Sequence, residues 1–245
     1  PQISLNHQWQ IDHKSSLSTA LYVSIGRGYG YSGQGRTSAW RSKWNGSSNG
    51  ILLNDYRKAD GTFDYGKIQD ENAASATGSN MVMSKSVNDH MWYGLLSTYT
   101  NEILPGLELS AGVDARYYIG KHTNEIIDLY GGQYFIDDGD RKNVKVENNA
   151  AAADPSWVNE KLTVGDIVYR DYDGHVHQEG VFAQLEYNKG RLSSFLSGSF
   201  SNTGYWRVDR FYYDAAHQRS ETINFLGFTA KGGVNYNVTR YSNIF

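Results

Sequence analysis

The chain has 245 residues, no cysteine and a formal net charge of −3, from 23 Lys and Arg against 26 Asp and Glu. The lack of cysteine excludes a disulfide framework, a thiol nucleophile and a Cys-ligated zinc site, and the charge balance excludes the basic surface that binds a nucleic-acid backbone. No segment approaches the ~18 consecutive apolar residues of a membrane-crossing helix. The mean hydropathy is −0.59, but amphipathic strands keep this value low even in a membrane β-barrel. The periodicity of the apolar residues therefore has to distinguish a soluble protein from a membrane β-barrel.

The first 25 residues predict a β-hairpin. Residues 3–11 and 17–25 alternate apolar and polar side chains with the period of a strand. The polar stretch 12–16 between them predicts a short turn.

Further alternating segments follow along the chain. Residues 107–119 alternate most clearly, and Pro105-Gly106 predicts the turn before them. Residues 89–101 alternate less cleanly, because Trp92 and Leu96 have the opposite parity. The later segments are 181–187, 192–204, 225–236 and the start of an eighth strand at 241–245.

The connections between these segments alternate in length. The short ones are 12–16, 102–106, 188–191 and 237–240. The long ones are about 28–88, 120–178 and 205–222. A transmembrane β-barrel has this rhythm, with tight periplasmic turns at one rim and long extracellular loops at the other. The pattern predicts an all-β fold: an antiparallel transmembrane β-barrel segment of about seven or eight up-and-down strands.

Charged and aromatic residues within the strands have a consistent parity. The strand charges fall on the more polar face, which we expect to be the lumen; they are Glu108, Asp114, Arg116, Glu186 and Lys231. Aromatic residues on the apolar face near the short turns predict an interfacial belt of Trp9, Tyr99, Tyr187 and Tyr236. An opposite belt would comprise Tyr93, Tyr117 and Trp206. An antiparallel sandwich would also explain the alternation, but not the loop rhythm or the belts.

Two stretches of the sequence resemble a known family. Residues 17–30 (LSTALYVSIGRGYG) and 113–131 (VDARYYIGKHTNEIIDLYG) are similar to barrel segments of TonB-dependent outer-membrane receptors of the Bacteroides type. The resemblance implies an active importer in the bacterial outer membrane, with a TonB complex acting through a plug domain. Neither a plug domain nor a TonB box is recognisable in this sequence. We therefore expect residues 1–245 to be part of one outer-membrane β-barrel domain, about a third of a 22-stranded barrel.

A closed eight-stranded barrel is the competing architecture. Residues 241–245 are too few for an eighth strand to span, since about 9–11 residues are needed. An incomplete strand would leave an open edge in lipid, so the sequence favours a segment of a larger barrel.

Three short motifs suggest other chemistry, and each has a simpler interpretation. Residues 28–33 spell GxGxxG, but no βαβ unit surrounds them, so we interpret the glycines as a flexible loop root. His175 and His177 could direct two imidazoles to one side, but without a third ligand a solvated junction between loop and strand is favoured. Residues 137–140 (DDGD) lack the EF-hand spacing and predict an acidic turn. We expect no metal, no cofactor and no enzymatic activity.

The long loops carry the candidate ligand-binding residues. Aromatic side chains in polar loops are available for stacking or cation–π contact with a solute, or they pin the loops together. The candidates are Trp40, Arg41, Trp44, Tyr134 and Trp157.

Three functions are compatible with these patterns. The leading hypothesis is an active receptor that binds and imports a scarce solute, such as an iron chelate, a cobalamin, a glycan or a peptide. The alternatives are a passive porin or a structural or adhesive outer-membrane barrel, and a soluble carbohydrate-binding sandwich. The first two imply outer-membrane lipid as a partner, and none of the three implies nucleic acid.

Overall fold

The computed structural model describes residues 1–48 and 51–245. Nine strands form one antiparallel sheet in the order β1-β2-β6-β7-β8-β9-β10-β11, with β3 pairing with β6 as well. The strands are β1 Gln2–Gln10, β2 Ser15–Gly26, β3 Tyr29–Gly35, β6 Met81–Leu104, β7 Leu107–Asp128, β8 Ile167–Lys189, β9 Leu192–Asp209, β10 Ile223–Asn237 and β11 Asn243–Ile244. A separate pair consists of β4 Ser47–Ser48 and β5 Ile51–Leu52. The all-β prediction is confirmed, and the sheet is open.

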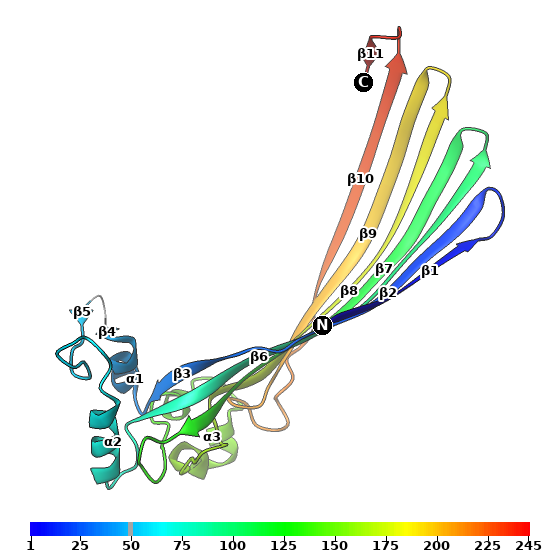
Figure 1. Cartoon of the computed structure of the whole chain (residues 1–245). Helices are drawn as coiled ribbons and strands as arrows, with labels where there is room; N and C mark the ends of the chain where they lie inside the picture. The colour runs from blue at the N-terminus through cyan, green and yellow to red at the C-terminus, as the bar shows by residue number, and fades with distance from the viewer. Residues whose placement is uncertain (49–50) are drawn as a thin grey trace.

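The molecule has two regions of different construction (Figure 1). The first, called the arm, is the long curved part of the sheet that ends in the short turns, and it comprises residues 1–26, 89–119, 174–207 and 223–245. The second, called the loop assembly, lies at the opposite end and comprises the described residues of 27–88, together with 120–173 and 208–222. None of the helices among the described residues is long and apolar enough to cross a membrane.

The strands extend further into the loop assembly than their alternation indicated. The predicted connection 28–88 contains β3 and the start of β6, and 120–178 contains the end of β7 and the start of β8. Arg170 at this end donates to Asn124 Oδ1 at 3.0 Å and to Ser86 Oγ at 2.7 Å, across three strands. Polar side chains bond along this face, so apolar alternation could not reveal these extensions.

The short turns follow the predicted residues closely. Leu104 pairs with Leu107, which leaves Pro105 and Gly106 as the turn between β6 and β7. Gly106 has φ of 82°, a left-handed conformation that glycine adopts without strain, and Pro at the preceding position fixes the turn. At the first turn, Asp12 Oδ1 accepts hydrogen bonds from the backbone N–H groups of Lys14 and Ser15.

The strand register gives the arm two chemically different faces, because directly opposite residues lie on the same face. One row across the sheet is polar in every strand; it contains Gln10, Ser16, Thr100, Ser110, Gln184, Ser197 and Lys231. The adjacent row lies on the other face; it contains Trp9, Leu17, Tyr99, Ala111, Ala183, Gly198 and Ala230. On this apolar face Leu226 and Phe228 are 71 % and 85 % exposed.

The loop assembly has the buried cores that the arm lacks. One core contains Val82, Ile126, Phe135, Leu162 and Val168, and it packs between the extended strands and the loop that follows β7. A second core joins β6 to two helices, α1 Ser38–Asn45 and α2 Tyr65–Ala74. The remaining helical segments are η1 Arg141–Asn143, α3 Ala150–Ala153 and η2 Pro155–Asn159.

The two longer helices begin at side-chain caps. Thr37 Oγ1 accepts from the backbone N–H of Trp40, and Asp64 Oδ1 accepts from that of Lys67. Gly35 ends β3 where α1 passes, and a Cβ at this position would lie 2.1 Å from the backbone nitrogen of Arg41. A glycine is therefore required for α1 to pack directly on the end of β3.

Candidate functional site: the polar face and the loop assembly

The five strand charges predicted to face the lumen share one face of the sheet. Glu108 lies opposite Glu186, and Asp114 and Arg116 have the same parity as Glu108 along β7. Lys231 lies in the row of Gln184, two residues from Glu186 along β8. Arg116 donates to Asp114 through Nε at 3.1 Å and Nη2 at 2.8 Å, so these two charges neutralise each other.

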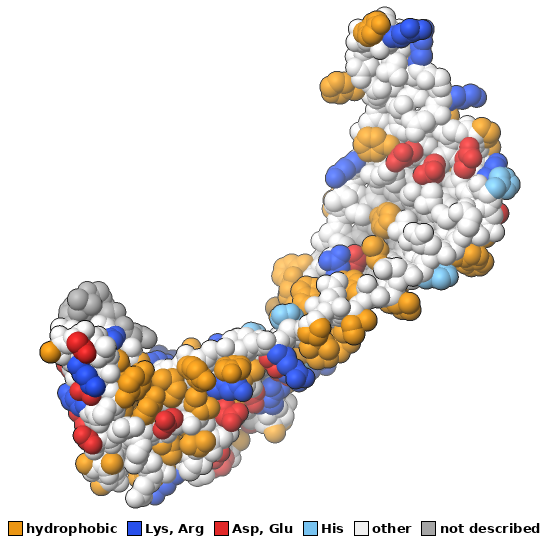
Figure 2. Space-filling model, viewed as in Figure 1, with side chains coloured by type: hydrophobic (Ala, Val, Ile, Leu, Met, Phe, Trp, Pro, Cys, Tyr) orange, Lys and Arg blue, Asp and Glu red, His pale blue; other side chains and the backbone are white. Residues whose placement is uncertain are grey.

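Carboxylates are concentrated at one end of this face. Glu102 lies opposite Glu108, which lies opposite Glu186, so three acids cross β6, β7 and β8 in one row. Figure 2 shows acidic side chains side by side across the arm near its short turns. Glu102 accepts a hydrogen bond from the backbone N–H of Gly106, and Glu186 accepts one from Gln184. Like charges directly opposite each other destabilise a sheet, so cations beside this row would stabilise it.

The aromatic belt on the apolar face crosses the sheet obliquely. Trp9 and Tyr99 lie in one row, and Ala183 and Ala230 are the residues of β8 and β10 in that row. Tyr187 and Tyr236 lie four and six residues further toward the short turns. With a rise of about 3.3 Å per residue and a strand spacing of about 4.8 Å, six residues over six strand steps give a tilt of about 35°. Membrane barrels have strand tilts of about 35–45°.

The separation of charges between the faces fails at Asp89, Glu179 and Lys189, which have the parity of the apolar face. Glu179 lies opposite Ala115 and Asn202, on the apolar face, and its side chain is exposed. The shorter strand predicted for this region, 181–187, did not include it. Large apolar side chains on the polar face, such as Phe182 and Phe195, are further exceptions to the alternation.

The loop candidates Trp40 and Trp44 both pack in the second core, around Tyr56 and Met81. Trp44 stacks on Phe63 at 5.1 Å with an interplanar angle of 8°, and its Nε1 donates to the carbonyl of Gln34 at 2.9 Å. Trp40 keeps part of its surface accessible and lies 6.5 Å from the ring of Tyr56. Trp44 thus anchors α1 to the sheet, and both tryptophans keep part of their surface accessible.

The third candidate, Arg41, joins α1 to the acidic turn at 137–140. Its guanidinium pairs with Asp140 and lies 4.8 Å from the ring centre of Tyr169. Asp138 in the same turn pairs with Arg36 and with Lys142. Ion pairs therefore connect the acidic turn to α1, to Arg36 before that helix and to Lys142 after the turn. The segment forms a turn, as the sequence predicted.

The remaining candidates, Tyr134 and Trp157, lie in the loop between β7 and β8. Lys161 is positioned over the ring of Tyr134 at 4.6 Å. The buried Arg141 lies over the ring of Trp157 at 4.7 Å, donates to the carbonyl of Trp157 at 3.0 Å and pairs with Glu160. All five candidates belong to the loop assembly, but they do not converge on one pocket among the described residues.

A buried carboxyl is the most perturbed acid of the acidic turn. Asp137 is 1 % exposed, and its Oδ1 accepts from the backbone N–H of Asp140 at 2.8 Å. Burial and the nearby charge of Asp140 raise the pKa of Asp137 to about 6, although the Asp140 hydrogen bond and Arg141 act in the opposite direction. Burial also opposes ionisation of Asp138, but hydrogen bonds from Lys142 and Arg36 prevail and lower its pKa.

The two histidines of the HVH motif lie inside β8 rather than at a loop junction, so that interpretation was wrong. His175 and His177 face the same side, and the ring of Trp206 lies 4.9 Å from the first and 5.7 Å from the second. Tyr117 Oη shares a hydrogen bond with His175 Nδ1 at 2.9 Å. No group of acids or histidines among the described residues is arranged to hold a metal.

The burial of two charged residues of the loop assembly was not predicted from sequence. Asp137 and Arg141 are buried, and they look like ordinary charges of a polar loop until the fold surrounds them. The only available signal was the density of acidic residues at 137–140 beside basic residues at 141–142.

Comparisons with known proteins give likenesses in structure but none in sequence. No protein-family model matches the chain, and no curated protein matches it by sequence. Among solved structures, it is similar to the open form of the ferric-catecholate import receptor Fiu from E. coli K12, with a TM-score of 0.45 and 7 % identity. The match covers 99 % of this chain and 34 % of the receptor, so the chain spans about a third of that protein's length.

Proposed function

We propose that this chain forms part of the barrel wall and the solute-capturing loops of an outer-membrane receptor of the TonB-dependent kind. The observation that carries the proposal is the apolar face of the arm, crossed by an aromatic belt at the tilt of a membrane barrel. Large side chains such as Phe228 are exposed on that face, which water would penalise and lipid would not. The polar face then surrounds the lumen, with Glu108, Asp114, Arg116, Glu186 and Lys231 facing inward.

The acidic row is compatible with an occupied lumen. Three opposed carboxylates at the short-turn end repel each other, and cationic side chains of an enclosed domain would stabilise them. A plug domain inside the barrel would supply such a surface, and the TonB complex would act through it. An acidic row can also select cations in a passive pore, so it is the sequence resemblance to TonB-dependent receptors that favours import.

The loop assembly is the proposed capture surface. Its two cores and its ion pairs make it an ordered structure, as a selective site requires. We propose Trp40, Arg41, Tyr134 and Trp157 as solute contacts, with Trp44 supporting Trp40 from within the core. The solute class, an iron chelate, a cobalamin or a glycan, and the Bacteroides type of the receptor are finer proposals that rest on the sequence resemblance.

Energised uptake is the test that separates import from passive flow. Cells carrying the full-length receptor would be offered a labelled iron chelate, cobalamin and oligosaccharide, with and without an uncoupler of the proton gradient. We expect uptake of one probe to stop when the gradient collapses and also in cells that lack TonB. Uptake that continues unchanged in both conditions would identify a porin.

Two tryptophan variants of α1 test the loop candidates against each other. Trp40→Ala should weaken uptake of the transported probe several-fold while the receptor remains abundant in the outer membrane. Trp44→Ala should loosen α1, which is detected as faster proteolysis of the loops. If Trp40→Ala leaves uptake unchanged, Trp40 is a packing residue and the solute binds elsewhere.

A further inference from the structure

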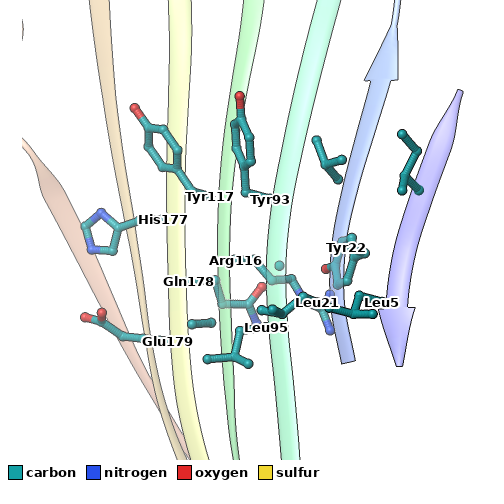
Figure 3. A pocket seen from close by; sticks show the side chains of 14 residues that line it. Leu5, Leu21, Tyr22, Tyr93, Leu95, Arg116, Tyr117, His177, Gln178 and Glu179 are labelled. Carbon is teal, nitrogen blue, oxygen red and sulfur yellow. The ribbon is translucent and has the colours of Figure 1, made fainter. Parts of the chain in front are cut away.

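A groove of about 590 Å³ crosses the apolar face of the arm. It runs across β1, β2, β6, β7 and β8, and Tyr93 and Tyr117 are among the residues that line it (Figure 3). Leu5 and Leu21 line one end, and Leu95 and Ala115 line the middle of the row. Ala115 has a smaller side chain than its neighbours in the row, which leaves the surface hollow at this point.

The other end of the groove is polar. His177 and Glu179 line it, and the neighbouring strands add Asn202 and Asn224. Asn202 Nδ2 donates to Glu179 Oε1 at 3.1 Å and to Asn224 Oδ1 at 3.2 Å. Gly204 makes room for this cluster, since a Cβ there would lie 2.1 Å from the ring of His177.

This polar cluster is not complete by itself. Asn202 Oδ1 is buried and has no hydrogen-bond partner in the part of the chain that the structure describes. Glu179 is exposed and carries the only charged carboxylate of the cluster, which offers acceptors to a molecule in the groove. Polar groups on an otherwise apolar face are costly unless something pairs with them.

The two ends of the groove lie at different depths, given the membrane orientation proposed above. Leu5 is four residues from Trp9, and Glu179 is eight residues from Tyr187. At about 3.3 Å per residue and a tilt of about 35°, Leu5 lies roughly 11 Å and Glu179 roughly 22 Å from the aromatic belt, measured along the membrane normal toward the loop assembly. The apolar band of a barrel is about 25 Å tall, so the apolar end lies near the bilayer centre and the polar end near its outer boundary.

We propose that this groove binds a glycolipid of the outer leaflet, and this inference rests on the proposed function. An acyl chain lies along Leu5, Leu21 and Leu95, and the sugar headgroup donates hydroxyl and amide hydrogen bonds to Glu179 and its neighbours. The chemistry disfavours a headgroup that presents only phosphate, because a carboxylate repels it. Only an amphiphile with its chain directed toward the bilayer centre matches both ends of the groove.

The test measures lipids that the full-length receptor retains after purification in mild detergent. Each variant would be delipidated, and native mass spectrometry would then follow binding of three probes: a disaccharide glycolipid without phosphate, phosphatidylethanolamine and phosphatidylglycerol. Ala115→Leu fills the groove, and its matched control, Ala183→Leu, adds the same volume on the same face outside it. Glu179→Leu combined with Asn202→Leu removes the polar end and makes the face more apolar.

We expect at least fivefold weaker glycolipid binding in Ala115→Leu and in the Glu179→Leu, Asn202→Leu double variant, with no change in Ala183→Leu. Equal binding in all four proteins, or equal binding of all three probes to the unmodified receptor, would refute the glycolipid site. Heat-modifiable migration of each variant shows that its barrel has assembled. A receptor absent from the outer membrane would contradict the proposed function instead, so the two failures are distinguishable.

Discussion

The arm and the loop assembly bury their apolar residues in opposite ways. Every fully buried large apolar side chain of the described residues, from Tyr56 to Phe211, belongs to the loop assembly or to the strand ends that enter it. In the arm, side chains such as Leu5 and Phe228 are exposed although their strands pair with a neighbour in the sheet. One sheet therefore has two different surroundings. At one end packed loops and water cover it, and at the other end, as we propose, lipid covers its apolar face.

This contrast separates what stabilises each region. The loop assembly depends on small packed cores and ion pairs between side chains, so it should respond to cavities and to pH. The arm depends on the backbone ladder and on the match between its apolar face and its surroundings, so it should respond to charge on one face only. Four experiments test this comparison.

The largest effect should follow removal of a core side chain from the loop assembly. Phe135 is fully buried, and Phe135→Ala should destabilise the loops by about 3–5 kcal/mol, since it leaves a cavity among Ile126 and Leu162. Hydrogen exchange of residues 120–173 should accelerate while heat-modifiable assembly is retained. Tyr134→Ala next to it is the control, with a much smaller effect because that ring is partly exposed.

Charge on the apolar face should affect the arm selectively. Val113 is 43 % exposed on that face, six residues after the start of β7, and Val113→Arg should cost on the order of 2–4 kcal/mol at the bilayer centre. Asp114→Arg, one residue along on the polar face, should assemble normally. Equal amounts of heat-modifiable barrel for the two variants would contradict the assignment of the faces.

Protonation of Asp137 should make the loop assembly depend on pH. Its folded-state pKa is raised to about 6, so the protonated form stabilises the fold at low pH, and this contribution is lost as the pH rises from about 4 through 6. The full effect is about 3 kcal/mol at most. Asp137→Asn should slow hydrogen exchange of the loops at pH 7.5 and change little at pH 4. An identical pH profile in the variant would show that another group is responsible.

The smallest effect should come from a surface ion pair. Arg210 donates to Asp171 and Asp173 at 2.8–3.1 Å, and these bonds raise its pKa above the ordinary value. The group is exposed, so Arg210→Ala should cost about 1 kcal/mol or less and lose that effect in high salt. Hydrogen exchange near residues 208–213, measured at two salt concentrations, checks this. A larger, salt-independent loss would indicate a packing role for the side chain.

The sequence predicted most of the arm because its information is local. Alternation identified the strands near the short turns, and Pro105-Gly106 identified a turn that only a few residue types can form. The same signal failed in the strand extensions, where Asn124 and Arg170 bond to each other across the sheet. It also missed Glu179, because the predicted strand began two residues later.

For the loop candidates, the sequence supplied composition but not environment. It identified Trp44 and Trp157 as candidates. The stacking of Trp44 on Phe63 and the position of Arg141 over Trp157 depend on contacts between segments that are distant in the sequence. The burial that raises the pKa of Asp137 likewise exists only after α1 and the loop beyond β7 have packed together.

By itself, the sequence determined the strand period, the turns and the division of the arm into a polar and an apolar face, since each follows from near neighbours along the chain. Only the tertiary structure decided the register that tilts the aromatic belt, the groove between Leu5 and Glu179, and the cores of the loop assembly. These features depend on which distant residues lie opposite each other. That choice is fixed by packing and hydrogen bonding over the whole sheet.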